Sequence, residues 1–258
     1  MVRGLYTAIS GMVVQEAKQD VITNNLANTN TVGFKSDSLS SQSFEDVLIQ
    51  NYSKRENGVP ERTLLGTLNL GSRINDTATN FTGGNIQATD IDTDFAIEGR
   101  GFFTVRKNNG SDQNYYTRNG HFHVNMDGYM LDDSGDYIMG TNLATNTTEP
   151  IKLGKGSVSC DPYGNVSVDG QAKYKFNFVD FNDYTKLKKI GDNLFQGDNP
   201  IQNFNASVEN KALEGSNVNV MKGMTDMMTT MRVFESNQKT VQSIDETVGK
   251  AVNEVGKV

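Results

Sequence analysis

The C-terminal part of this 258-residue chain repeats apolar residues at alternating four- and three-residue steps, which is the spacing of a heptad seam. Two positions inside the repeat, Gln238 and Asp245, depart from the apolar pattern. The apolar positions are Val220, Met224, Met227, Met231, Phe234, Val241, Val248, Val252 and Val255.

The N-terminal part predicts a second long helix, whose apolar residues cover a broad surface. These residues are Leu5, Ile9, Met12, Val13, Ala17, Val21, Ile22 and Leu26. Neither helix has a large core of its own to cover. Each must find a partner in the other terminus, in a neighbouring copy, or in both, so the chain is predicted to assemble.

Composition excludes several classes of partner. The formal net charge is -7, from 31 acidic and 24 basic residues, and the basic residues form no stripe. We therefore expect no nucleic-acid partner. We also expect no membrane insertion, because no apolar run approaches the roughly 18 residues of a membrane span. Arg3 is followed by Glu16 and Asp20 before any apolar stretch develops, which argues against a cleavable signal peptide. A single cysteine, Cys160, rules out an internal disulfide.

Four zones are predicted along the chain: an N-terminal assembly helix (1–33), an extended connecting segment (34–85), a β-rich outer domain (86–212) and a C-terminal heptad assembly helix (213–258). The first helix itself is expected over residues 3–28, and the last over about 216–256 with Ser216 or Asn217 as its N-cap. In the connecting segment, a short helical turn is expected around Phe44–Ile49, and the rest is expected to be extended or loop-like.

Short alternating strands and turn signals fill the middle zone. Asp127-Gly128 and Asp169-Gly170 are both strong hairpin signals. The predicted fold is a mainly β middle domain, sandwich or barrel-like, with long N- and C-terminal helices that pair as a coiled-coil-like assembly region.

Three aspartates have the spacing of the first ligands of a calcium loop. Asp90, Asp92 and Asp94 occupy positions one, three and five, but Phe95 and Gly101 stand where an EF-hand needs Gly and Glu. A solvated loop or strand edge is the better interpretation.

His121 and His123 lie on one side of a candidate strand, and no third metal ligand is evident, so exposed strand positions are favoured over a metal site. Cys160 has no neighbours typical of a nucleophile and is expected to be a small buried hydrophobe. The sequence thus predicts no enzyme activity, no metal and no cofactor.

A glycan-binding β domain is the alternative of a different class. Exposed aromatic residues often bind sugars, and Tyr115, Tyr116, Tyr129 and Tyr137 are the candidates. The heptad termini would have no purpose in such a protein.

Seven motifs, in order along nearly the whole chain, resemble the flagellar rod and hook family. They are LYTAISGM (Leu5–Met12), NNLANTNTVGFK (Asn24–Lys35), AIEGRGFFTV (Ala96–Val105), YTRNGHFHVNMDGYML (Tyr116–Leu131), LKKIGDNLF (Leu187–Phe195), EGSNVNV (Glu214–Val220) and MRVFESNQKT (Met231–Thr240).

This resemblance implies a structural subunit of the bacterial flagellar basal body. The terminal helices would form the inner tube of a helical assembly, and the β domain its outer layer. Implied partners are copies of the chain itself, other rod and hook subunits, and the flagellar export apparatus. The implied location is the basal body, reached by export beyond the cytoplasmic membrane.

Among the members of the family, the distal rod subunit is the most similar in the placement and length of Ser43–Thr63 and Leu65–Gln87. A proximal rod subunit or a hook subunit is the alternative.

The residues predicted to form the assembly interface come from both helices. They are Leu5, Ile9, Met12, Val13, Ile22, Leu26, Val220, Met224, Met227, Met231, Phe234, Val241, Val248 and Val252. The methionines at 221, 224, 227, 228 and 231 are expected to be adaptable packing material and not a ligand groove.

Overall fold

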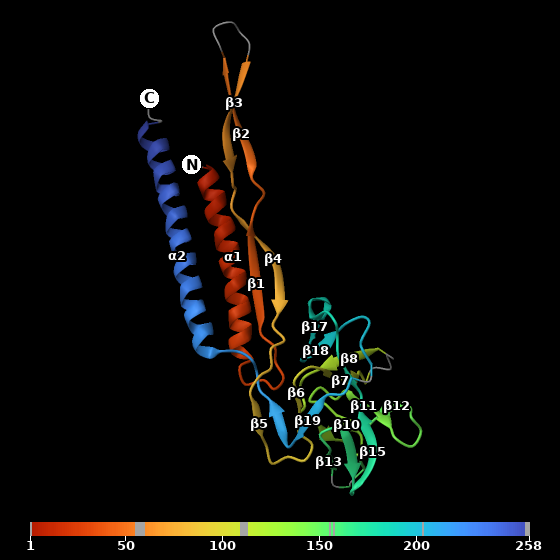
Figure 1. Cartoon of the computed structure of the whole chain (residues 1–258). Helices are drawn as coiled ribbons and strands as arrows, with labels where there is room; N and C mark the ends of the chain where they lie inside the picture. Colours follow the sequence, from red (N-terminus) through yellow and green to blue (C-terminus); the bar gives the residue numbers. More distant parts are fainter. Residues whose placement is uncertain are drawn as a thin grey trace. The chain divides into compact units, whose positions relative to one another are not determined.

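The computed structural model describes residues 2–54, 60–108, 113–154, 156, 158–202 and 204–255 (Figure 1). The chain divides into two compact units. Unit 1 comprises Met1–Leu26, Asp37–Ala78 and Val220–Val258, and unit 2 comprises Ala27–Ser36 and Thr79–Asn219. The chain therefore passes between the units several times.

Two long helices belong to unit 1. Helix α1 spans Val2–Ala27, which confirms the predicted N-terminal helix. Helix α2 spans Val220–Lys250 and continues as a π-helical turn over Ala251–Val255. None of the described helices is long and apolar enough to cross a membrane.

The predicted N-cap of the C-terminal helix is wrong, because α2 begins at Val220. Ser216 Oγ instead accepts a hydrogen bond from the backbone N–H of Val218, before the helix begins. The side chain of Asn217 is engaged within unit 2, as described below.

Helices α1 and α2 lie side by side and antiparallel (Figure 1). A β-carbon placed on Gly11 would lie 2.9 Å from Nδ2 of Asn237, and one placed on Gly223 would lie 2.9 Å from Cδ2 of Leu26. The absence of a side chain at these two glycines therefore permits the close approach of the helices.

The face of α2 that turns towards α1 has heptad spacing, but it is shifted from the predicted seam by one residue at alternate positions. Met224 and Met231 of the predicted seam are 52% and 40% exposed. The less exposed stripe consists of Gly223, Met227, Thr230, Phe234, Asn237, Val241 and Ile244. Coiled-coil geometry itself remains a prediction.

The connecting segment forms strands, so the helical turn predicted at Phe44–Ile49 is wrong. Strand β1 (Asp37–Ser43) pairs with β4 (Ser72–Thr79), and β2 (Val47–Lys54) pairs antiparallel with β3 (Pro60–Leu68). The run Val47–Ile49 favours an extended backbone, because its side chains suit a pleated surface and pair across to β3.

Side-chain hydrogen bonds tie α1 to the segment before β4. Thr7 Oγ1 donates to the carbonyl of Leu70, and Ser10 Oγ accepts from the N–H of Ser72. Strands β1 and β4 therefore lie along α1 within unit 1 (Figure 1).

Unit 2 is β-rich, as predicted for the middle of the chain. Its strands are β5 (Ile86–Ala88), β6 (Phe95–Glu98), β7 (Phe102–Arg106), β8 (Asn114–Thr117), β9 (His123–Val124), β10 (Met130–Leu131), β11 (Tyr137–Asn142), β12 (Thr148–Pro150), β13 (Val158–Cys160), β14 (Asn165–Val168), β15 (Gln171–Phe176), β16 (Phe178–Val179), β17 (Lys188–Gly191), β18 (Leu194–Gln196), β19 (Ser207–Asn210) and β20 (Ala212–Glu214). One short 3-10 helix, η1, covers Tyr184–Lys186.

Most of these strands join one network in the order β13-β14-β15-β11-β7-β8-β18-β17. Separate antiparallel pairs are formed by β6 with β19 and by β5 with β20. A sandwich or barrel is not established by this order and remains a prediction.

Both predicted hairpin turns are present. The turn before β10 contains Gly128 at φ 84°, and that between β14 and β15 contains Asp169 at φ 52° and Gly170 at φ 78°. Positive φ is the conformation that Asp-Gly and Asn-Gly pairs supply at low cost.

Aromatic side chains fill the core of unit 2 in two clusters. In the larger cluster, Phe103 meets Phe122 edge to face at 5.1 Å between ring centroids and Phe176 at 5.3 Å. The smaller cluster surrounds Phe102 and includes Phe195, with Phe81 packed against it. Phe81 and Tyr184, which pack against the smaller cluster, also line the cavity described below.

Candidate assembly surfaces and a buried charge cluster

None of the residues predicted to form the assembly interface is fully buried in the single chain. Leu5, Met12, Ile22, Leu26, Met227, Phe234 and Val241 are half-buried. Ile9, Val13, Val220, Met224, Met231, Val248 and Val252 are exposed. That these side chains contact neighbouring subunits remains a prediction.

Four exposed methionines gather on one face of the N-terminal half of α2. Met221 is 77% exposed, and Met224, Met228 and Met231 share its side at three- and four-residue steps. This Met face lies one residue beyond the stripe that turns towards α1. Large apolar side chains left in water in this way are typical of an interaction surface.

A buried cluster of three charged side chains lies in unit 2. Lys35 Nζ lies 2.6 Å from Glu214 Oε1, and Arg118 Nη1 lies 3.3 Å from Glu214 Oε2. All three side chains are at most 4% exposed. Two cations thus share one carboxylate away from water.

Backbone groups complete the cluster. Lys35 Nζ also donates to the carbonyl of Thr82 at 2.9 Å, Arg118 Nη2 donates to the carbonyl of Gly99 at 2.7 Å, and the N–H of Gly84 donates to Glu214 Oε1 at 2.8 Å. Gly84 has no room for a side chain, because an added β-carbon would collide with the carbonyl oxygen of Gly215. The carboxylate therefore bridges three segments that are distant in sequence.

Burial is the largest cause of the pKa shifts of Lys35 and Arg118. It lowers the pKa of the Lys35 ammonium and of the Arg118 guanidinium, although the Glu214 carboxylate acts in the opposite direction on both. One carboxylate does not offset the loss of water around two cations.

Asn217 clamps the chain segments beside this cluster. Its Oδ1 accepts from the N–H of Ser36 at 2.8 Å, and its Nδ2 donates to the carbonyls of Asn80 at 2.7 Å and Thr82 at 3.2 Å. Ser36 and Asn80 are also joined directly, by a backbone hydrogen bond of 2.8 Å. These contacts hold together the end of the 27–36 segment and both ends of the 79–219 segment of unit 2.

The hairpin of β17 and β18 lies against the segment Val32–Lys35, which contains the lysine of the charge cluster. Lys189 Nζ donates to the carbonyl of Lys35 and lies 3.8 Å from the centre of the Phe34 ring. Asn193, in the hairpin turn, donates to the carbonyl of Val32 at 2.8 Å. The Leu187–Phe195 motif is thereby placed against the Asn24–Lys35 motif.

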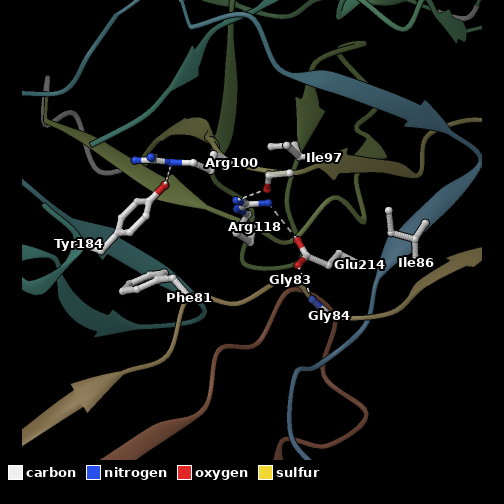
Figure 2. Close-up of a pocket in the computed structure, with 10 residues that line it drawn as sticks. Phe81, Gly83, Gly84, Ile86, Ile97, Arg100, Arg118, Tyr184 and Glu214 are labelled. Atoms are coloured by element: carbon white, nitrogen blue, oxygen red, sulfur yellow. Dashed lines mark hydrogen bonds and ion pairs between the residues drawn. The ribbon is translucent and has the colours of Figure 1, made fainter. Parts of the chain in front are cut away.

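A cavity of about 280 Å³ opens beside the cluster (Figure 2). Arg118 and Glu214 form one side of it, and Arg100 lies on another side, with its Nε donating to the hydroxyl of Tyr184 at 3.0 Å. The remaining lining residues are Phe81, Gly83, Gly84, Ile86, Ile97 and Gly99.

The predicted calcium-loop aspartates are used in other ways. Asp92 forms an ion pair with Lys211 at 2.7 Å. Asp94 is buried, contrary to the predicted solvated position, and accepts hydrogen bonds from Thr89 and pairs with His121 Nδ1 at 2.8 Å. No group of three or more His, Cys, Asp or Glu among the described residues is arranged to hold a metal ion.

Cys160 is half-buried and packs against the larger aromatic cluster. Burial raises the pKa of its thiol to about 12, with a smaller contribution from the Asp161 carboxylate. The thiol is therefore protonated at neutral pH and is a poor nucleophile.

The aromatic residues proposed for glycan binding do not form an exposed platform. Tyr116 is buried against Phe181, and Tyr129 and Tyr137 pack on each other edge to face at 5.6 Å. The glycan-binding alternative is not favoured.

The sequence analysis gave no role to Lys35, Arg118 or Glu214 and gave Asn217 only that of a helix N-cap, although all four lie inside the recognised motifs. Each stands beside a glycine or a polar turn within its motif, which is the only local signal available. Contacts across 179 residues, as between Lys35 and Glu214, have no local pattern.

Three family descriptions match parts of the chain. "Flagella basal body rod protein" matches residues 5–35, "Flagellar hook protein FlgE/F/G D1 domain" matches 96–168, and "Flagellar basal body rod FlgEFG protein C-terminal" matches 209–254.

Similar proteins extend over the whole chain. Flagellar basal-body rod protein FlgG of Buchnera aphidicola subsp. Acyrthosiphon pisum is 31% identical and aligns over 97% of this chain and 98% of its own length. Flagellar basal-body rod protein FlgF of Caulobacter vibrioides is also 31% identical, over 100% of both chains. Flagellar hook-basal body complex protein FlhO of Bacillus subtilis is 29% identical, over 100% of both chains.

Proposed function

This chain belongs to the flagellar basal-body rod and hook family, and on that premise we propose that it is a structural subunit of the basal-body rod that polymerises into a helical tubular drive shaft. Proteins of the same length that bear the name of rod protein align with it from end to end. The proposal includes no enzymatic activity and no cofactor.

The observation that carries the proposal is the exposed Met face of α2. One stripe of α2 turns towards α1, and the next stripe, with Met224 and Met231, remains open to solvent. A helix with two apolar stripes can contact its own chain and a neighbour at once. Different patches then meet on successive subunits, which is the arrangement that builds an open helical polymer.

The predicted interface residues extend this scheme to α1. Ile9 and Val13 of the predicted set are 39% and 52% exposed, and Tyr6, which was not predicted, lies three residues before Ile9 and is 64% exposed. We propose that neighbouring subunits cover this α1 face and the Met face, with the paired helices forming a coiled-coil-like inner tube. Flexible methionine side chains suit contacts that differ around the tube.

The finer assignment is the distal part of the rod, with a proximal rod or hook subunit as the alternative. Its support is the segment Ser43–Thr63, which includes β2 and the beginning of β3. The FlgG of Buchnera aphidicola and the FlgF of Caulobacter vibrioides are each 31% identical to this chain. Sequence identity to these two relatives therefore does not distinguish the possible assignments within the family.

The partners we propose are further copies of this chain, other rod and hook subunits, and the flagellar export apparatus. The proposed location is the basal body, beyond the cytoplasmic membrane and without a cleaved signal peptide. Electron microscopy of basal bodies that carry a labelled chain tests this, and label confined to the hook would replace the rod assignment.

Deletion of Asn51–Thr63 tests the role of the hairpin in the polymer. Residues 51–54 and 60–63 of this segment pair with each other in β2 and β3, and the rest of the segment lies outside the described residues. We propose that this hairpin adds lateral contacts that keep subunits from sliding, so its removal is expected to yield curved or polymorphic filaments in electron micrographs.

A matched variant separates length from sequence, by replacing Asn51–Thr63 with a Gly/Ser segment of equal length. Curved filaments from the deletion and straight rods from the replacement would indicate that length alone matters. Straight, rigid rods from the deletion would mean that the segment is a passive connection.

A further inference from the structure

The cavity beside the buried charge cluster lies wholly within unit 2 and has a strongly cationic lining. Its lining includes two guanidinium groups, those of Arg100 and Arg118, and one carboxylate, that of Glu214. Lys35 adds a third cation directly behind Glu214. Figure 2 shows both arginines and Glu214 around the same space.

Three cations, Lys35, Arg118 and Arg100, and two carboxylates, Glu214 and Asp180, surround the cavity and leave a net charge of +1. Lys35 and Arg118 carry two positive charges, and Glu214 supplies one negative charge to both. Nε of Arg118 is also buried without a hydrogen-bond partner among the described residues. A buried donor without a partner costs free energy, and the net positive charge around the cavity favours an anion there.

Arg100 provides an accessible donor at the opening. Its side chain is 59% exposed, and its Nε and Nη2 are held by the Tyr184 hydroxyl, the Phe181 carbonyl and the Asp180 carboxylate. None of the hydrogen bonds described for Arg100 uses Nη1. The guanidinium is therefore fixed in place while one of its nitrogens can still donate.

Apolar walls complete the cavity. Phe81 and Tyr184 stack at 5.1 Å between centroids, and Ile86 and Ile97 lie across from them (Figure 2). Gly99 faces open space, since an added β-carbon would meet no atom within 4 Å. The cavity thus suits an anionic group attached to a short hydrocarbon segment.

We propose that this cavity is a carboxylate-binding site, in which Arg100 and Arg118 bind the carboxylate and Phe81, Ile86 and Ile97 contact its hydrocarbon part. A planar carboxylate matches the paired donors of a guanidinium. The carboxylate comes either from a small organic acid or from an acidic side chain of a second copy of this chain.

Malonate is the probe for direct binding to the purified full-length monomer. We expect saturable binding by isothermal titration calorimetry, with a rise in the midpoint of thermal unfolding that sodium chloride at equal ionic strength does not give. Arg100→Gln should weaken malonate binding about tenfold or more, because a charge-assisted hydrogen bond is lost.

Two further variants locate the site. Ile86→Phe fills the cavity without a change of charge and should abolish binding. Lys186→Gln removes one exposed positive charge from unit 2 outside the cavity and should leave the affinity unchanged. Equal malonate affinity in the wild type, Arg100→Gln and Ile86→Phe would overturn the proposal.

The self-association of the same variants distinguishes the two sources. If malonate does not bind the monomer, but Arg100→Gln and Ile86→Phe weaken self-association and Lys186→Gln does not, the carboxylate belongs to a second copy. If malonate does not bind and these variants do not affect self-association, the site is refuted. Direct binding is measured on the monomer, so its failure leaves the proposed rod function standing.

Discussion

Glu214 is a buried carboxylate that joins segments of unit 2 that are distant in sequence. It joins Lys35, Arg118 and the backbone of Gly84, which come from three distant parts of the chain. If the carboxylate is removed, two cations remain buried without their shared partner. The cost of breaking a buried ion pair is typically about 3–5 kcal/mol.

Glu214→Gln is therefore expected to lower the free energy of unfolding of unit 2 by about 3 kcal/mol or more. Urea denaturation followed by tyrosine fluorescence measures the change. Glu98→Gln is the matched control, because Glu98 is exposed at the end of β6 and should change stability little. Equal midpoints for the two variants would show that the cluster contributes nothing net.

Cys160 offers a second test at the scale of one residue. Its thiol has a pKa of about 12 in the folded chain, against an ordinary value of 9.0. At pH 9 the folded protein should therefore react with iodoacetamide two to three orders of magnitude more slowly than the urea-unfolded protein, because the thiolate is the nucleophile.

The same pKa shift predicts a dependence of stability on pH. Between pH 9 and about 12 the folded thiol keeps a proton that the unfolded thiol has lost. Its contribution to stability is therefore complete below pH 9 and is lost as the pH rises towards 12. Cys160→Ser should reduce the loss of stability over this range, and an unchanged slope would contradict the shift.

At the scale of elements, the strands and hairpins of unit 2 were easier to predict than the contact face of α2. Asp-Gly pairs specify turns through local backbone preference, so Asp127-Gly128 and Asp169-Gly170 were found from sequence alone. On α2, apolar residues occupy two adjacent stripes. The stripe that turns towards α1 contains Gly223, Thr230 and Asn237, which give no hydrophobic signal.

The charge cluster and the cavity could not be predicted for a different reason. Each contact in them joins residues far apart in sequence, such as Arg118 and Glu214, which are separated by 96 residues. No periodicity or turn preference encodes such a pairing. The motifs indicated which segments matter, and tertiary packing determined what their charged residues do.

Met231 tests the Met face of α2. In the single chain it is 40% exposed, so Met231→Asp should leave the monomer's thermal midpoint nearly unchanged. Polymerisation should fail, because assembly would bury an unpaired carboxylate. Met231→Leu is the matched control and should assemble, since its volume and polarity are similar. Normal motility with Met231→Asp would mean that this position is not covered in the rod.

At the scale of the whole molecule, the two units should separate on dissection. Ser36 and Asn80 are joined by a backbone hydrogen bond, so a short Gly/Ser linker can replace residues 37–78. The resulting chain over residues 27–219 retains all of unit 2 and is expected to melt cooperatively, by circular dichroism, with a β spectrum. It should remain monomeric in sedimentation, because it lacks both α1 and α2.

The shorter fragment 86–212 is the informative comparison. It lacks Lys35, Phe81 and Glu214, and should therefore melt at a lower temperature than the 27–219 chain. An unfolded 27–219 chain, alongside cooperative melting of the full-length protein, would show that the helices and the β-rich unit fold as one.

The antiparallel pairing of α1 with α2 also has a consequence in time. Val220 follows Ala27 by 193 residues, so α1 leaves the ribosome long before its partner exists. At about 5–20 residues per second, the delay is roughly 10–40 s. Throughout that interval Leu26, which lies beside Gly223 in the finished unit, has no α2 to pack against. A chaperone that recognises exposed apolar helices would have its opportunity in this interval, and should bind nascent chains that end before Val220 more strongly than complete ones.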